Sequence, residues 1–183
     1  MLDPKEISLC LITKDPVYPP EIILEVTTYK FGEILILTNC DSPHRKHELF
    51  AKTKYDTIAY QDDDAICPWL DLLKYSDPTK INIAFKPQHF EAYKDRRLAV
   101  GFGWGAIFPK HLLQSLKRYT DVYGEDEVYK RETERILTYL NWPQNRMVLP
   151  ITDLPSATAP DRLSMQPKHY DYIPIVEEKC RVL

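Results

Sequence analysis

The residues most able to do chemistry are three consecutive aspartates, Asp62, Asp63 and Asp64, which follow a strand-like run over residues 57–60. Adjacent carboxylates repel one another, so this cluster calls for a neutralising cation. Asp62 and Asp64 can aim oxygen ligands at one Mg²⁺ or Mn²⁺ that also neutralises a bound diphosphate. Two other interpretations stay open: residues 60–63 match the YxDD box of polymerase palms, and the triplet can be a solvated turn that caps the next helix.

Two earlier apolar runs also end in polar residues. Residues 7–12 predict a buried first strand, and residues 34–37 predict a parallel strand covered on both faces. In an open parallel sheet, ligands bind outside the carboxyl ends of the strands. We therefore expect the polar ends at 13–15, 38–41 and 61–64 to line one crevice.

Apolar periodicity along the rest of the chain predicts further strands and helices. We expect an α/β fold, with a mostly parallel central sheet flanked by helices, in a single domain over 1–183. Its nucleotide-binding half covers about 1–66, and its acceptor and catalytic half covers about 67–183. The remaining predictions are a surface helix within 42–54, helices near 20–29, 69–73, 109–119 and 124–140, a half-buried strand at 80–85, a polar connection over 86–97, a last strand near 147–151 and a weakly periodic tail from 152.

Composition excludes several classes of protein. A net charge of -3 argues against a nucleic-acid partner and against a polymerase palm, which needs a basic channel and a second acidic strand. No apolar run approaches the ~20 residues of a membrane span. The N-terminal residues lack signal-peptide features, so we expect a cytoplasmic protein. Four cysteines without CxxC spacing predict reduced thiols and no zinc site.

A glycine-rich segment over residues 101–105 places three of the five glycines together. Such a segment lets backbone approach a ligand closely, and Phe102 and Trp104 offer faces on which a sugar or base can stack. A tight bend with buried rings explains the same pattern.

Two more sites carry candidate chemistry. Glu125 and Asp126 open a predicted helix, where a carboxylate caps the N-terminus or acts as a general base. His169 lies in the irregular tail, where it can be a metal ligand or an ordinary surface residue. The other four histidines, His44, His47, His89 and His111, predict only surface roles.

Together these elements resemble the nucleotide-sugar-dependent glycosyltransferases of the GT-A fold. Four motifs occur in that family's order over nearly the whole chain: an Asp-x-Asp metal motif (62–64), a glycine-rich acceptor loop (101–105), an x-Glu-Asp motif (124–126) and a C-terminal metal-binding His169.

The resemblance implies a metal-dependent transfer of a sugar from a nucleotide diphosphate, with a UDP-sugar favoured, to a hydroxyl acceptor such as a glycan, with inversion. The metal, Mn²⁺ or Mg²⁺, would stabilise the leaving group. The implied metal ligands are Asp64, His169 and Asp62, and the base is Asp126 or its neighbour Glu125. The implied nucleotide-binding residues are Thr13, Lys14, Asp15, Asn39, Asp62, Asp63 and Arg162, with Lys168 as another candidate beside the diphosphate, and the acceptor-binding residues are Gly103, Trp104 and Gly105.

The chain departs from the family in being short, which leaves little room for acceptor-specific insertions. Two rivals remain. A nucleotidyltransferase normally needs a Gly-rich, Arg/Lys-bearing signature after the first strand, which residues 14–16 lack. A non-catalytic binding module of the same fold has no need to keep clustered carboxylates. The sequence does not specify an oligomeric state.

Overall fold

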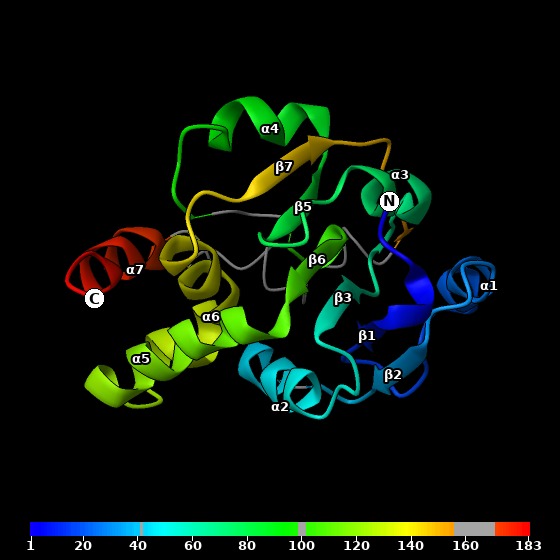
Figure 1. Ribbon diagram of the computed structural model, residues 1–183. Helices are drawn as coiled ribbons and strands as arrows, with labels where there is room; N and C mark the ends of the chain where they lie inside the picture. The colour runs from blue at the N-terminus through cyan, green and yellow to red at the C-terminus, as the bar shows by residue number, and fades with distance from the viewer. Residues whose placement is uncertain (41, 99–101, 156–170) are drawn as a thin grey trace.

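The computed structural model describes residues 1–40, 42–98, 102–155 and 171–183. A six-stranded sheet in the order β2-β1-β3-β6-β5-β7 forms the centre (Figure 1). Its strands all run in one direction except β6, which is antiparallel to both neighbours. The predicted α/β fold with a mostly parallel central sheet is therefore confirmed. The strands are β1 (Ile7–Ile12), β2 (Glu33–Leu37), β3 (Thr57–Asp62), β5 (Asn82–Phe85), β6 (Ala106–Pro109) and β7 (Asn145–Val148).

Helices cover both faces of the sheet, as predicted. Helices α1 and α3 pack on one face, and α2, α5 and α6 pack on the other, with α7 outside α6 (Figure 1). The α-helices are α1 (Pro20–Thr27), α2 (Lys46–Ala51), α3 (Trp69–Tyr75), α4 (Pro87–Tyr93), α5 (Gln114–Tyr123), α6 (Glu127–Leu140) and α7 (Tyr172–Arg181). Short 3-10 helices are η1 (Pro4–Glu6), η2 (Pro43–Arg45), η3 (Phe102–Trp104) and η4 (Lys110–Leu113).

Strand β1 lies between β2 and β3 and is buried along its whole length. Its side chains alternate between two hydrophobic clusters: Leu9 and Leu11 face α1 and α3, whereas Cys10 and Ile12 face α2. A strand with helices on both sides needs apolar residues at every position, which is why residues 7–12 form a continuous apolar run.

Strand β2 corrects one prediction. It is parallel to β1, as expected, but it is the edge strand of the sheet. Ile34 and Ile36 are 36% and 47% exposed, so the strand is not covered on both faces. A continuous apolar run indicates a parallel strand, but it does not distinguish a central strand from an edge strand.

Three other elements differ from expectation. The connection over 86–97 contains α4, whose apolar stripe is weak, and the tail contains α7, which buries Ile173, Val176 and Cys180 on one face. Strand β5 is buried at all four positions instead of half-buried, because β6 and β7 flank it and helices cover it. Within the described part of the chain, no helix has the length and apolarity needed to cross a membrane.

Candidate active site at the strand ends

The polar ends of β1, β2 and β3 meet at one edge of the sheet because these strands are parallel neighbours. The Cys40 amide donates to the Thr13 carbonyl over 3.0 Å, and the Asn39 amide donates to the Asp15 carbonyl over 3.1 Å. Asn39 has a φ of +52°, a conformation that asparagine adopts more readily than most residues. The three strand ends lie together as predicted, whereas the crevice expected there stays a prediction; the side chains of Asp15 and Asn39 are exposed.

Asp63 connects the loop after β1 to the loop after β3 by a hydrogen bond. Its carboxylate accepts a hydrogen bond from the hydroxyl of Thr13, which in turn accepts one from the Asp15 amide over 3.0 Å. Thr13 and Asp63 are each only 1% exposed. These two side chains therefore hold the loops together, and Lys14 lies partly exposed between Thr13 and Asp15. The nucleotide contacts expected of these residues stay predictions.

Asp62, the last residue of β3, lies between a buried polar cluster and the glycine-rich turn. Its Oδ1 accepts a hydrogen bond from the Tyr60 hydroxyl and lies 3.7 Å from the Lys46 ammonium. On the other side, a Cβ added to Gly103 would lie 1.9 Å from Asp62 Oδ2. Only glycine fits at position 103 while the carboxylate keeps this orientation.

Glu134 of α6 completes the cluster and was not predicted from the sequence. It accepts a hydrogen bond from Lys46 and lies 3.4 Å from the Tyr60 hydroxyl. Lys46, expected on a polar surface helix, is buried instead, with its ammonium 4.8 Å from the centre of the Tyr60 ring. The pairing joins positions 88 residues apart, so no local motif reveals it.

The electrostatics of the cluster leave Asp62 with a raised pKa of about 7. Burial is the largest cause. The ammonium of Lys46 opposes the shift, whereas the negative charges of Glu134 and Asp64 add to it. Asp62 therefore has two carboxylates and one buried ammonium as charged neighbours among the described residues.

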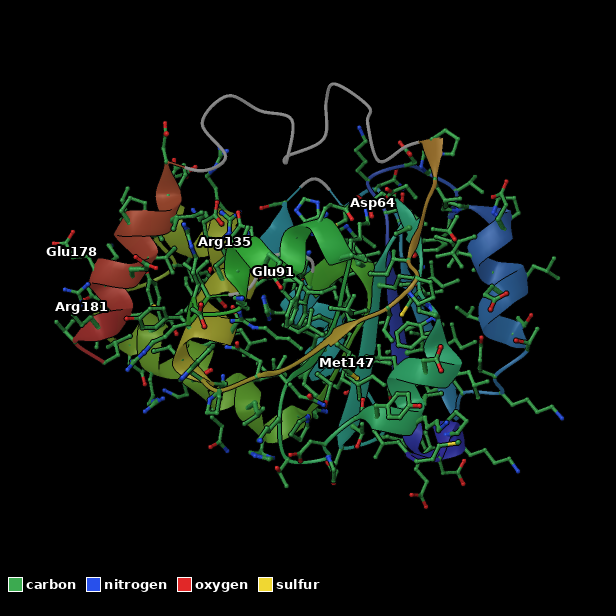
Figure 2. All side chains as sticks on the ribbon, turned by 90° about the horizontal axis from the view of Figure 1, so that it is seen from above. Asp64, Glu91, Arg135, Met147, Glu178 and Arg181 are labelled. Atoms are coloured by element: carbon green, nitrogen blue, oxygen red, sulfur yellow. The ribbon has the colours of Figure 1, made fainter. Side chains whose placement is uncertain are left out.

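Asp64 occupies the turn that leads into β4 (Ala65–Ile66). This two-residue strand pairs with β8 (Thr152–Asp153), and the Leu154 amide donates to the Asp64 carbonyl over 2.9 Å. Asp64 lies beside the strand ends, whereas Glu178 and Arg181 of α7 lie at the far side of the molecule (Figure 2).

The glycine-rich turn packs against the same edge, at the start of β6. Gly105 has a φ of +147°, and a Cβ there would lie 2.2 Å from the Cys67 sulfur, so this position also requires glycine. Phe102 is 1% exposed and packs on Tyr60, which corrects its expected role as a stacking surface for ligands. For Phe102, the alternative interpretation of the glycine-rich segment, a tight bend with buried rings, is therefore the correct one.

Trp104 is held differently from Phe102. It is partly exposed, and the Lys86 ammonium lies 4.3 Å from its ring centre. Lys86 also pairs with Asp153 of β8, and the His89 ring lies 4.9 Å from the Trp104 ring. One part of the indole is therefore already covered by a cation.

Asp126 and Glu125 are not part of the Asp62 cluster. Asp126 is the N-cap of α6, accepts from the Tyr129 amide over 2.8 Å and pairs with Lys179 of α7. Burial opposes its ionisation, but these bonds from Lys179 and Tyr129 outweigh burial and lower the pKa of Asp126. The capping alternative is confirmed, and the role as a base stays a prediction. Glu125 is exposed beside it.

Gly101, Arg162, Lys168 and His169 lie outside the described residues. Over 1–40, 42–98, 102–155 and 171–183, no three side chains of histidine, cysteine, aspartate or glutamate converge as a metal site. Of the three expected metal ligands, Asp62 and Asp64 are described and His169 is not.

Comparisons with known proteins give little. No family model matches the chain, and no curated protein matches it. Among solved structures, the crystal structure of A197 from STIV is similar over 62% of this chain and 69% of that one, with 14% sequence identity and a TM-score of 0.43.

Proposed function

We propose that this protein is a metal-dependent glycosyltransferase that moves a sugar from a nucleotide-diphosphate sugar to an acceptor hydroxyl, with inversion. One observation carries the proposal. The expected acceptor turn lies directly against an expected metal ligand: a Cβ added to Gly103 would lie 1.9 Å from Asp62 Oδ2 in its present orientation. Donor and acceptor sites must adjoin for transfer, and the loops of Asp15 and Asn39 border the same edge.

The charge at the end of β3 also supports a cation. Burial is the largest cause that raises the pKa of Asp62, and the negative charges of Glu134 and Asp64 raise it further against the opposing ammonium of Lys46. Mg²⁺ and ions like it are commonly held by one or two carboxylates, with the remaining positions taken by water and substrate phosphates. Asp62 and Asp64 fit that arrangement, and His169 remains a further candidate ligand.

In this proposal each group has a distinct task. Asp15 and Asn39, both exposed, bind the nucleoside part of the donor, and Asp64 with Asp62 holds the metal. When bound, the metal would offset the charge that develops on the leaving diphosphate. Trp104 presents its uncovered part to the acceptor. Asp126 or Glu125 takes the proton of the acceptor hydroxyl, which requires Asp126 to leave its ion pair with Lys179.

Calorimetric titration with UDP-, GDP- and dTDP-sugars tests donor binding. We expect at least one donor to bind with Mn²⁺ present and to bind at least tenfold more weakly with EDTA. Asp64→Asn removes one charged ligand and should abolish the metal dependence, whereas Asp126→Asn should leave binding intact. Failure of every donor to bind, with or without metal, refutes the proposal.

Turnover tests the base separately. Asp126→Asn should retain donor binding and lose transfer, because an amide cannot accept the acceptor proton. Glu134→Gln is the control: it makes the same kind of change, from carboxylate to amide, at a residue of α6 that belongs to the Asp62 cluster. If Asp126→Asn keeps its turnover, the base assignment is wrong even where donor binding stands.

A further inference from the structure

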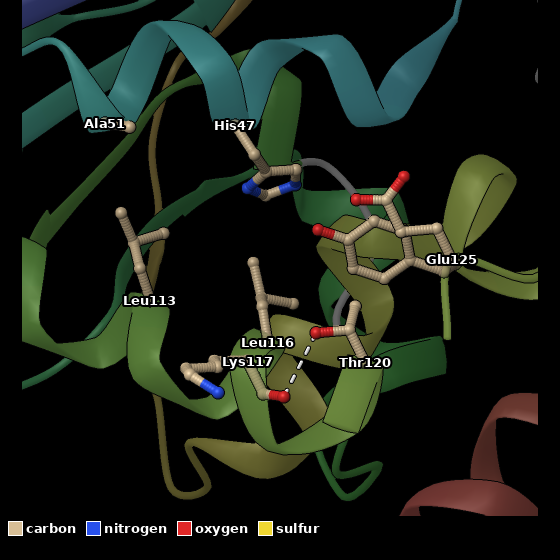
Figure 3. A pocket seen from close by; sticks show the side chains of 8 residues that line it. His47, Ala51, Leu113, Leu116, Lys117, Thr120 and Glu125 are labelled. Carbon is tan, nitrogen blue, oxygen red and sulfur yellow. Dashed lines mark hydrogen bonds between the residues drawn. The ribbon is translucent and has the colours of Figure 1, made fainter. Parts of the chain in front are cut away.

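A pocket of about 250 Å³ lies between α2, α5 and the start of α6 (Figure 3). Leu113, Leu116 and the ring of Tyr129 form much of its wall, and His47 of α2 points into it. Glu125 and the exposed Lys117 lie at its rim. Thr120 of α5 also lines it, so the wall is mainly apolar with polar groups from His47 and Thr120.

His47 is the unusual member of this wall. Both ring nitrogens are buried, and neither has a hydrogen-bond partner among the described residues. Leaving a buried donor or acceptor unpaired costs about 1–3 kcal/mol for each group. The ring packs edge-on against Phe50 and beside Tyr129, so its orientation is fixed by packing and not by hydrogen bonds.

The protonation state of His47 limits what can bind. Burial is the largest cause that lowers the pKa of His47, and the positive charge of Lys46 adds to it; the pKa falls to about 3. A neutral imidazole offers one donor and one acceptor. A hydroxyl group matches it, because a hydroxyl both donates and accepts.

The size and walls of the pocket narrow the class of ligand. A cavity of about 150 Å³ with apolar walls can hold benzene, so this pocket has room for one substituted ring. A sugar ring carries a hydroxyl on most carbons. Within the pocket, His47 and Thr120 can pair some of these hydroxyls, but the Thr120 hydroxyl already donates to the Lys117 carbonyl over 3.1 Å, and those beside Leu113 and Leu116 would be unpaired. A flat ring with a single hydroxyl avoids that cost and can pack against Tyr129.

We propose that this pocket is a binding site for a neutral aromatic ring with one hydroxyl group, a phenol, whose hydroxyl pairs with the His47 imidazole. The pocket has Glu125, a candidate base of the proposed transfer, at its rim, but phenol binding does not depend on glycosyl transfer.

The direct test is a titration of the full-length protein, with ¹⁵N-labelled histidine, by phenol. We expect saturable binding in which the ring nitrogens of His47 shift and those of His111 do not. Benzene, which has the shape without the hydroxyl, should bind roughly tenfold more weakly, the factor that one hydrogen bond of about 1.4 kcal/mol supplies. Methyl glucopyranoside should not bind.

Three variants sharpen the test. His47→Phe keeps an aromatic ring and should weaken phenol binding roughly tenfold. Ala51→Phe fills the pocket from an exposed position and should abolish binding in a folded protein. Lys117→Gln is the matched rim change and should alter affinity less than twofold, since the ligand is neutral. The proposal is overturned by no saturation with phenol, by equal binding of benzene, or by tighter binding of the glucoside.

Discussion

Asp62 and Asp126 each lie beside a lysine, and helix α6 takes part in both arrangements. At the end of β3, Asp62 shares the buried Lys46 with Glu134. At the start of α6, Asp126 pairs with Lys179 and also accepts a hydrogen bond from the Tyr129 backbone amide. In the first arrangement two carboxylates share one ammonium, whereas in the second one carboxylate pairs with one ammonium.

The two carboxylates consequently respond to protons in opposite ways. Burial and neighbouring negative charge raise the pKa of Asp62 to about 7, whereas hydrogen bonds from Lys179 and the Tyr129 amide lower that of Asp126. Balanced pairing stabilises a helix end, and unbalanced pairing creates a place where a further cation is favoured. This contrast locates the candidate chemistry at the strand end.

Replacing the lysine of each arrangement should give the largest difference between them in the free energy of unfolding. Lys46→Met leaves Asp62 and Glu134 without their cation, and we expect a loss of about 3–5 kcal/mol in the free energy of unfolding. Lys179→Met removes a partly exposed partner and should cost about 1 kcal/mol or less. Urea unfolding of both variants at pH 7 measures the difference, and equal losses would contradict it.

The contact between Asp62 and the glycine turn gives the next largest effect. Gly103→Ala places a methyl group against Asp62 Oδ2 and should cost about 2–3 kcal/mol. Gly124→Ala is a suitable control: its φ is +67°, but the added carbon meets no atom within 4 Å, so backbone strain alone should cost about 1 kcal/mol.

A double-mutant cycle identifies the cause of that loss. In an Asp62→Ala background the obstructing carboxylate is absent, and most of the cost of Gly103→Ala should disappear. If the cost is unchanged, the glycine is required for another reason and the contact does not link the turn to the aspartate.

The pH dependence of unfolding gives a smaller contrast of opposite sign. The pKa of Asp62 is raised above its unfolded value of about 3.9, so its contribution to stability is lost as pH rises from about 4 through 7. Relative to Asp62→Asn, the EDTA-treated wild type should lose about 1–2 kcal/mol over that range, allowing for the 31% exposure of the side chain.

Asp126 should behave in the reverse direction. Its pKa is lowered, so its contribution is present above the unfolded pKa and is lost as pH falls through the folded value. Wild type should therefore lose its advantage over Asp126→Asn on acidification towards pH 3. Urea unfolding across pH 3–8 tests both aspartates, and parallel profiles for the two variants would contradict the comparison.

Much of the fold followed from apolar patterns in the sequence. The run at 7–12 became β1 with the predicted bounds, and the three polar strand ends met as expected. Helix α4 was missed because Phe90 and Tyr93 are its only large apolar residues, which is too weak a stripe to stand out. The edge position of β2 depends on strand order, which local pattern does not encode.

The site was predictable only where it is contiguous. Asp62 to Asp64 stand together in the sequence, and Gly103, which packs against Asp62, lies in a glycine-rich segment. Lys46 and Glu134 come from two helices, and their importance arises from burial beside Tyr60. A lysine five residues beyond the polar segment 38–41 gives no local sign that it will be buried. Similarly, nothing in the sequence near His47 indicates that both of its ring nitrogens are buried without partners.

The most direct test of the central claim is Mn²⁺ binding by electron paramagnetic resonance, in the presence of a nucleotide-diphosphate sugar that binds the wild type. We predict that Asp64→Asn weakens Mn²⁺ binding at least tenfold and that Asp126→Asn changes it less than twofold. Undiminished Mn²⁺ binding by Asp64→Asn, or an equal loss in both variants, would contradict the assignment of the metal to the end of β3.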